Sequence, residues 1–214
     1  AMPGVRCRLH IFEPRYRLMM RRCLDSGQRQ FGMCLTPDSE YGTMLLIQHY
    51  EQLADGRSAI LTEGTRRFRV LEWGQKDGYA TGRIRWVEDE SEDISPESGA
   101  ENDAEDAEAA EDGTMQVAAD AQRLRRIVDA YLAQFFPPDA RSLLEHEVGP
   151  VPASDGNDGP FCPSFVFWCI AVRGLPPRVA YNLCFGDEFR HKPAKRLKAT
   201  LAFWARHLER SARH

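Results

Sequence analysis

The order of hydrophobic and polar positions divides the chain into a strand-rich first part and a helical second part. Residues 5–11 alternate between apolar and polar side chains, with Leu9 and Ile11 on the same side. A period of two is typical of a strand with one buried face. The apolar positions then take helical spacing, and Gly27 ends this segment. The chain therefore begins with a strand that leads into one amphipathic helix.

Short extended runs follow this helix at a spacing of about ten residues, and turn sequences such as Asp55-Gly56 and Asp77-Gly78 separate some of them. The five runs are residues 31–35, 44–47, 58–62, 67–70 and 80–86. Short strands at this spacing predict a mostly antiparallel sheet, curled into a sandwich or partial barrel around the first helix.

The second part carries apolar residues at helical spacing. The expected helices are residues 114–136, 140–147, 163–172, 177–185 and 192–213. The helix at 163–172 is apolar on every side, so we expect its neighbours to cover it. The fold class predicted is therefore α+β, with a β-rich N-terminal lobe and an α-helical C-terminal lobe.

The net charge of −4 hides an uneven distribution. Residues 88–113 hold 13 acidic side chains and no Lys or Arg, whereas the rest of the chain carries 28 basic and 19 acidic side chains. Dense like charge with few large apolar residues predicts a disordered insert. A solvated Ala/Glu helix over residues 100–110 is the alternative. The predicted division is a β-rich lobe at 1–87, an acidic insert at 88–113 and a helical lobe at 114–214.

Sequence motifs for catalysis, cofactors and metals are absent. The chain contains neither GxGxxG nor GxxxxGK[ST] for phosphates, and no HExxH, GxSxG, SxxK or CxxC. We expect no catalytic, cofactor-binding or metal-binding residues, and six free thiols in a reducing, intracellular setting, which is cytoplasmic with the nucleus as the alternative. No apolar run is long enough to cross a membrane. A cryptic hydrolase, whose nucleophile and histidine meet only in the fold, is one alternative.

Basic stretches suggest a second alternative, a nucleic-acid-binding module. They lie at residues 15–22, 66–69 and 192–198. No recognised nucleic-acid module accompanies them, so we favour arginines that cover solvent faces and neutralise the acidic insert.

The run Leu9-His10-Ile11-Phe12-Glu13-Pro14-Arg15-Tyr16-Arg17 closely resembles the signature of the Lon N-terminal (substrate-binding) domain family. Residues 30–34, 55–58, 67–71 and 76–79 continue this resemblance, which is greatest to the Lon-domain and RING-finger proteins. In the second part, Trp168 followed by Leu175-Pro176-Pro177 is also similar. The resemblance implies a β-rich lobe wrapped on one helix, followed by a helical lobe.

The resemblance also implies a role, which is non-catalytic recognition of protein or peptide substrates for a protease or ubiquitin-ligase system. Relatives carry ATPase, Ser/Lys peptidase or RING modules, and we expect none of these in the present sequence. They also have a further N-terminal strand before the segment that starts here at Met2. Without it we expect an open sheet edge that allows self-association into a homo-oligomer, or addition of a peptide.

Exposed aromatic and arginine side chains are the expected partner contacts, since these residue types dominate interface hot spots. Trp73, at the end of a strand, is the first candidate, and Arg66 and Arg67 follow it. Within the signature, Phe12, Tyr16 and Met19 lie on the apolar stripe and are expected in the core. Glu13 is expected to favour the helix N-terminus and to pair with an arginine.

Overall fold

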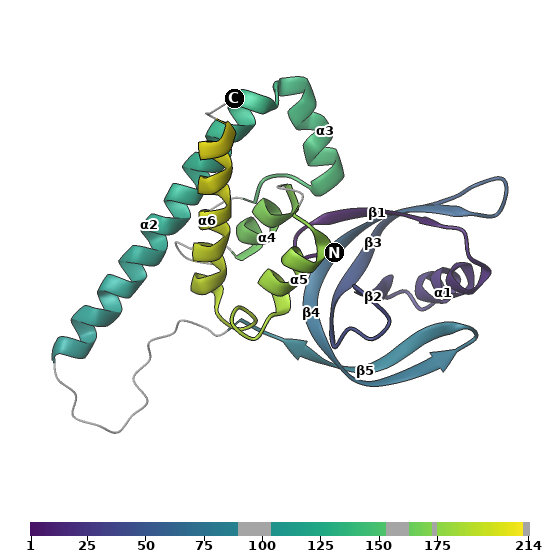
Figure 1. Ribbon diagram of the computed structural model, residues 1–214. Helices are drawn as coiled ribbons and strands as arrows, with labels where there is room; N and C mark the ends of the chain where they lie inside the picture. The colour runs from purple at the N-terminus through teal and green to yellow at the C-terminus, as the bar shows by residue number, and fades with distance from the viewer. Residues whose placement is uncertain (90–103, 153–162, 173–174, 212–214) are drawn as a thin grey trace.

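The computed structural model describes residues 1–89, 104–152, 163–172 and 175–211. It contains a lobe of strands with one helix beside them, and a lobe of helices packed against one end of the sheet (Figure 1). This arrangement confirms the α+β fold class predicted from the sequence.

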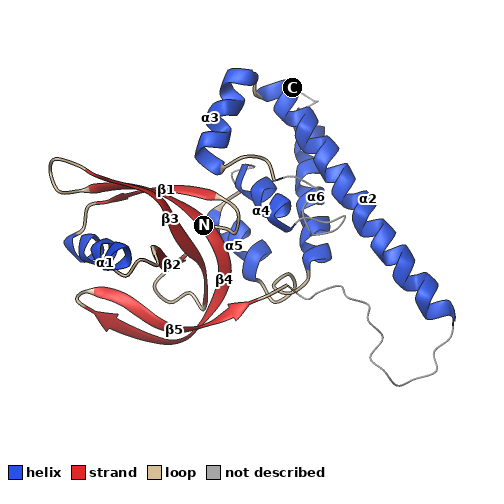
Figure 2. Ribbon diagram, turned by 180° about the vertical axis from the view of Figure 1, so that it is seen from behind, coloured by secondary structure: helices blue, strands red, loops and turns tan. Residues whose placement is uncertain are grey.

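The first lobe contains five strands that pair in antiparallel fashion. Its elements are β1 (Arg6–Ile11), α1 (Pro14–Asp25), β2 (Gln30–Cys34), β3 (Tyr41–Gln52), β4 (Ser58–Lys76) and β5 (Tyr79–Val87). The strand order is β1-β4-β3-β2, and β5 also pairs with β4. The strands curve around α1 (Figure 2), as the sequence pattern predicted.

The long strand β4 organises the sheet and corrects one sequence prediction. The runs at 58–62 and 67–70 were expected to be separate strands, but they belong to one strand of 19 residues. Gly64 between them makes no turn, because its hydrogen-bonded neighbours continue the strand on both sides. β1 and β5 lie along the same edge of β4. β1 pairs with the first residues of β4, and β5 pairs with the last residues of β4. β4 therefore extends from the middle of the sheet into the hairpin that it forms with β5.

The core of the first lobe forms between α1 and the sheet. Met20 of α1 is fully buried against Ile47 and Ile60, and Met19 is partly buried beside them. Phe12 was expected in this core, but it is 60% exposed. It precedes the helix, which begins at Pro14, so the helical spacing that assigned it to the apolar stripe does not extend to it.

The described residues of the second lobe form helices and the loops that connect them. The helices are α2 (Ala104–Phe135), α3 (Pro138–Val148), α4 (Pro163–Val172), α5 (Pro177–Phe185) and α6 (Pro193–Ser211). As predicted, α4 is central, and every residue from Phe165 to Ile170 is buried. Trp168 and Trp204 have no exposed surface, and the Trp168 indole donates to the Gly149 carbonyl at 3.0 Å.

The start of α2 differs from the predicted boundary. The helix begins at Ala104, within the segment 88–113 that was predicted to be a disordered insert. The alternative of an Ala/Glu helix over residues 100–110 is therefore correct from Ala104 onward. Residues 90–103 lie outside the described residues. Glu88 and Asp89 belong to the ordered fold, and the carboxylate of Asp89 is largely buried.

The two lobes share one apolar core. Val5, Tyr41 and Val87 of the strand lobe are buried in the same cluster as the helices. The Tyr41 ring stacks on Phe185 of α5, with 5.9 Å between the ring centroids. At the other side of the contact, Arg8 of β1 lies 2.8 Å from the Nε2 atom of His146 in α3.

Candidate functional site

Trp73 lies on the hairpin formed by β4 and β5, which we call the β4–β5 ribbon (residues 67–87). Its side chain is 43% exposed. Trp73 pairs with Gly82 across the ribbon, and a β carbon at Gly82 would lie 4.0 Å from the Trp73 ring. This distance is an ordinary van der Waals contact, so the Trp73 ring lies close to the strand at Gly82. The exposure of Trp73 meets the first requirement for a partner contact.

A second tryptophan lies on the same face of the ribbon. Residues two apart on a strand share a face, so Gly82, Ile84 and Trp86 point to the same side as Trp73. Trp86 is 38% exposed. The sequence reasoning did not single it out, although the alternation within residues 80–86 already placed it on one side of the strand. We call this side, with Val70, Trp73, Ile84 and Trp86, the tryptophan face.

Arg66 extends the tryptophan face at its inner end. Its guanidinium carbon lies 4.3 Å from the centroid of the Trp86 ring, a distance typical of a cation–π contact. The same guanidinium pairs with the carboxylate of Glu88, and about half of the Arg66 side chain is exposed. Arg66 is therefore an accessible cation beside an accessible indole.

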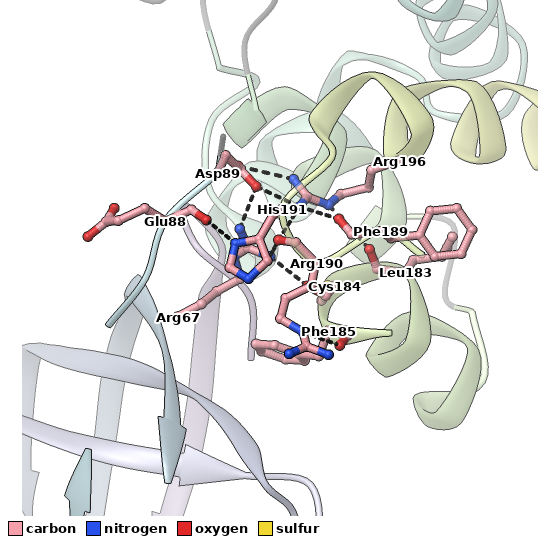
Figure 3. Close-up of polar contacts among 10 residues, drawn as sticks. All are labelled: Arg67, Glu88, Asp89, Leu183, Cys184, Phe185, Phe189, Arg190, His191 and Arg196. Atoms are coloured by element: carbon pink, nitrogen blue, oxygen red, sulfur yellow. Dashed lines mark hydrogen bonds and ion pairs between the residues drawn. The ribbon is translucent and has the colours of Figure 1, made fainter. Parts of the chain in front are cut away.

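Arg67 is not a surface residue, which corrects the assumption that made it a contact candidate. Its side chain is only 3% exposed. It donates to the carbonyls of Cys184 and Arg190 at 2.6 and 2.8 Å and to Asp89 Oδ1 at 2.5 Å (Figure 3). Alternation along β4 directs Arg67 to the face that the helical lobe covers. In this structure Arg67 joins the lobes and is not available to a partner.

Asp89 lies between two arginines at this junction. Arg196 of α6, which is fully buried, donates to both carboxylate oxygens of Asp89, at 2.7 and 3.2 Å. Burial on its own would raise the pKa of Asp89, but the hydrogen bonds and charges of Arg196 and Arg67 outweigh burial and lower it. Burial, followed by the charge of Arg196, also lowers the pKa of Arg67. The Arg196 guanidinium also donates to the backbone carbonyls of Leu183, Phe189 and Arg190.

The signature segment has a structural role at the start of α1. Glu13 pairs with Arg15 at 2.6 Å, which confirms the expected arginine partner, and it makes no side-chain cap to the helix. Arg15 also donates to the Gly78 carbonyl at the tip of the ribbon. Nearby, Arg22 pairs with Asp77 at 2.6 Å and donates to the Tyr79 hydroxyl. These contacts hold the ribbon tip against α1 and so fix the direction of the tryptophan face.

An apolar cavity of about 270 Å³ lies between the lobes, at the β2 end of the sheet. Met33 and Cys34 of β2 form one wall, and Ala180, Tyr181 and Phe185 of α5 form the other. Burial raises the pKa of the Cys34 thiol, and it raises that of the neighbouring Cys184 to about 11. Both thiols are therefore protonated at neutral pH, which gives neither the character of an activated nucleophile.

Within the described parts of the chain, no group of three or more His, Cys, Asp or Glu side chains could hold a metal ion. The helices described there include none that is long and apolar enough to span a membrane.

Comparison with known proteins agrees with this fold. The family model of the ATP-dependent protease La (LON) substrate-binding domain matches residues 1–143. A LON peptidase N-terminal domain and RING finger protein from Schizosaccharomyces pombe is 30% identical over 34% of this chain, and the match covers 19% of that protein's length. The matched segment thus spans about a fifth of the length of this relative.

Two solved structures have the same fold. The Lon N-terminal domain protein from Xanthomonas campestris superposes with a TM-score of 0.52 and 24% identity, covering 94% of this chain and 90% of that one. The N-terminal domain of Mycobacterium avium complex Lon protease gives 0.60 with 15% identity, covering 97% and 93%. With the family model matching most of the chain, this protein belongs to the LON substrate-binding domain family.

Proposed function

We propose that this chain is a non-catalytic recognition domain that binds protein or peptide substrates through the tryptophan face. The observation that carries the proposal is that Trp73 and Trp86, both more than a third exposed, share one face of a ribbon whose tip is held by α1. Exposed aromatic side chains on a rigid strand bind apolar segments at little cost in conformational entropy. Membership of a substrate-binding family supports the same role.

The domain serves a protein-degradation system in the intracellular, cytoplasmic compartment. A relative that joins a LON N-terminal domain to a RING finger supports a link to ubiquitin ligation, and the family's protease members support a link to proteolysis. In either setting the domain would select the substrate and another module would carry out the chemistry.

A binding experiment with one protein in two states tests this role. A test protein is used in its native form and in a reduced, carboxymethylated form that stays unfolded, and binding to the immobilised chain is measured by interferometry. We expect binding of the unfolded form only, and loss of most of that binding in Trp73→Ala. The control is Leu143→Ala, which removes a 69% exposed side chain from α3 in the other lobe. Equal binding by Trp73→Ala and Leu143→Ala would contradict the proposed contact.

A further inference from the structure

The outer edge of β5 lies beside the tryptophan face. Within the described residues β5 pairs with β4 alone, so its other side has no strand partner. Tyr79 and Val87 at the ends of β5 are buried, but the residues between them are at least partly exposed, and along them the unpaired edge presents backbone N–H and C=O groups that an extended chain can pair with.

The two faces of the β4–β5 ribbon differ in chemistry. One is the tryptophan face, with Ile84 and Trp86 contributed by β5. The opposite face carries Arg83 and Arg85 from the same strand, and both are exposed. Side chains of a strand added to β5 would alternate between these faces, so half of them would meet indole and aliphatic surface and the other half would meet guanidinium groups.

The charge on the arginine side is not balanced within the sheet. Arg83 is opposite Glu72 and lies 3.3 Å from its carboxylate. Arg85 is opposite Arg69, and like charges directly opposite each other destabilise a strand pair. Arg69 pairs with Glu40, whereas Arg85 has no acidic partner among the residues that the structure describes. An acidic side chain on a neighbouring strand would supply one.

The same charges argue against a second copy of this chain as the occupant. Two β5 strands paired edge to edge would bring their Arg83 and Arg85 side chains onto a common pair of strands, where they repel. An extended segment with acidic side chains gains the backbone hydrogen bonds without this repulsion.

We propose that the outer edge of β5 binds an extended peptide in which apolar and acidic residues alternate. The peptide pairs with β5 as an additional strand, its apolar side chains continue the tryptophan face, and its carboxylates lie beside Arg83 and Arg85. This inference rests on the proposed function and specifies which protein segments the domain prefers.

Three fluorescein-labelled ten-residue peptides test the proposal by fluorescence anisotropy at trace peptide concentration. The first peptide alternates valine and glutamate, and the second alternates valine and lysine. The third has the sequence of the first, but every second backbone nitrogen, on the edge that would pair with β5, is methylated and cannot donate a hydrogen bond. We expect the glutamate peptide to bind at least tenfold more tightly than either of the others. Equal affinity for the glutamate and lysine peptides would overturn the charge assignment, and equal affinity for the methylated peptide would overturn strand addition.

Charge-reversal variants of Arg83 and Arg85 test whether the peptide binds at β5. The double variant Arg83→Glu/Arg85→Glu is expected to bind the glutamate peptide at least tenfold more weakly than the wild type does. It is also expected to bind the lysine peptide more tightly than the glutamate peptide. The control, Arg178→Glu, reverses an exposed charge on α5 in the helical lobe and is expected to keep the original order. If both variants change the affinities alike, the peptide is bound by net charge and not at β5.

Failure of this inference is distinguishable from failure of the proposed function. If the unfolded test protein binds in a Trp73-dependent manner but the peptides show no preference for glutamate, recognition stands and the edge-strand mode is wrong. If neither the unfolded protein nor any peptide binds, the proposed function itself is wrong.

Discussion

The carboxylate of Asp89 accepts two hydrogen bonds from the guanidinium of Arg196, at 2.7 and 3.2 Å, although the residues lie 107 positions apart. Asp89 follows β5, whereas Arg196 belongs to α6 (Figure 3). Arg67 of β4 shares the same carboxylate. A single acidic residue therefore compensates two buried arginines at the point where the lobes meet.

Asp89→Asn is expected to lower the free energy of unfolding by about 3 kcal/mol, because removing one partner of a buried ion pair leaves the other charge uncompensated. Urea denaturation followed by circular dichroism measures the change. Asp55→Asn is the matched control, since Asp55 forms an exposed local pair with Arg57 and its loss should change stability little. A similar small change in Asp89→Asn would show that the backbone carbonyls alone stabilise Arg67 and Arg196.

The lowered pKa of Asp89 makes its contribution dependent on pH. A carboxylate whose pKa is lower in the folded state stabilises the protein above its unfolded pKa of about 3.9, and this stabilisation is lost as the pH falls through the folded value. The difference in unfolding free energy between the wild type and Asp89→Asn should be constant above about pH 5 and shrink below about pH 4. A difference that stays unchanged down to acid pH would contradict the assigned role of the Asp89 charge.

Truncation of two tryptophans should destabilise the protein to very different extents. Trp168→Ala removes a fully buried ring and its hydrogen bond to Gly149, so we expect a loss of about 4 kcal/mol in unfolding free energy. Trp73→Ala, at a 43% exposed position, should cost about 1 kcal/mol or less. Thermal denaturation of both variants measures the contrast. Similar losses for both would indicate that Trp73 is a core residue.

Gly42 of β3 should not tolerate a side chain. A β carbon there would lie 2.5 Å from the Phe68 ring, 2.7 Å from Cys34 Sγ and 2.7 Å from the Met33 carbonyl oxygen. Because a backbone atom is among these neighbours, the strands must shift, and Gly42→Ala should destabilise the protein by about 1–3 kcal/mol. Gly74→Ala, whose nearest contact is the mobile hydroxyl of Thr81, is the milder comparison in urea denaturation. Equal effects would contradict close packing of Phe68 on β3.

The sequence predicted the lobes, the antiparallel sheet and the buried helix α4 because each follows from local periodicity. It did not predict that residues 58–62 and 67–70 form one strand, because the pairing of β3 along both runs, which makes the strand continuous, is not a local property of the sequence. Alternation placed Arg67 and Arg69 on one face, but it contains no information on which part of that face the helical lobe covers. The partners of Arg67 lie 22 or more residues away, which local patterns do not reveal.

The candidate contact residues show the same difference between local sequence information and contacts that depend on the whole fold. Trp73, on the β4–β5 ribbon, and Arg66, in the middle of β4, are both accessible. Trp86 became a candidate only when the register of β4 against β5 placed it on the same face as Trp73. Cross-strand register and contacts between lobes depend on the whole fold, whereas the residue types suited to recognition are visible in the sequence.

The most direct test of the recognition role is a titration of the unfolded, carboxymethylated test protein against the wild type, Trp73→Ala and Leu143→Ala, with the folding of each variant checked by circular dichroism. Trp73 contributes an exposed indole to binding and little to stability, so we expect all three chains to be folded and only Trp73→Ala to lose affinity, by about tenfold or more. Undiminished binding by folded Trp73→Ala, or equal binding of the native test protein, would contradict the account.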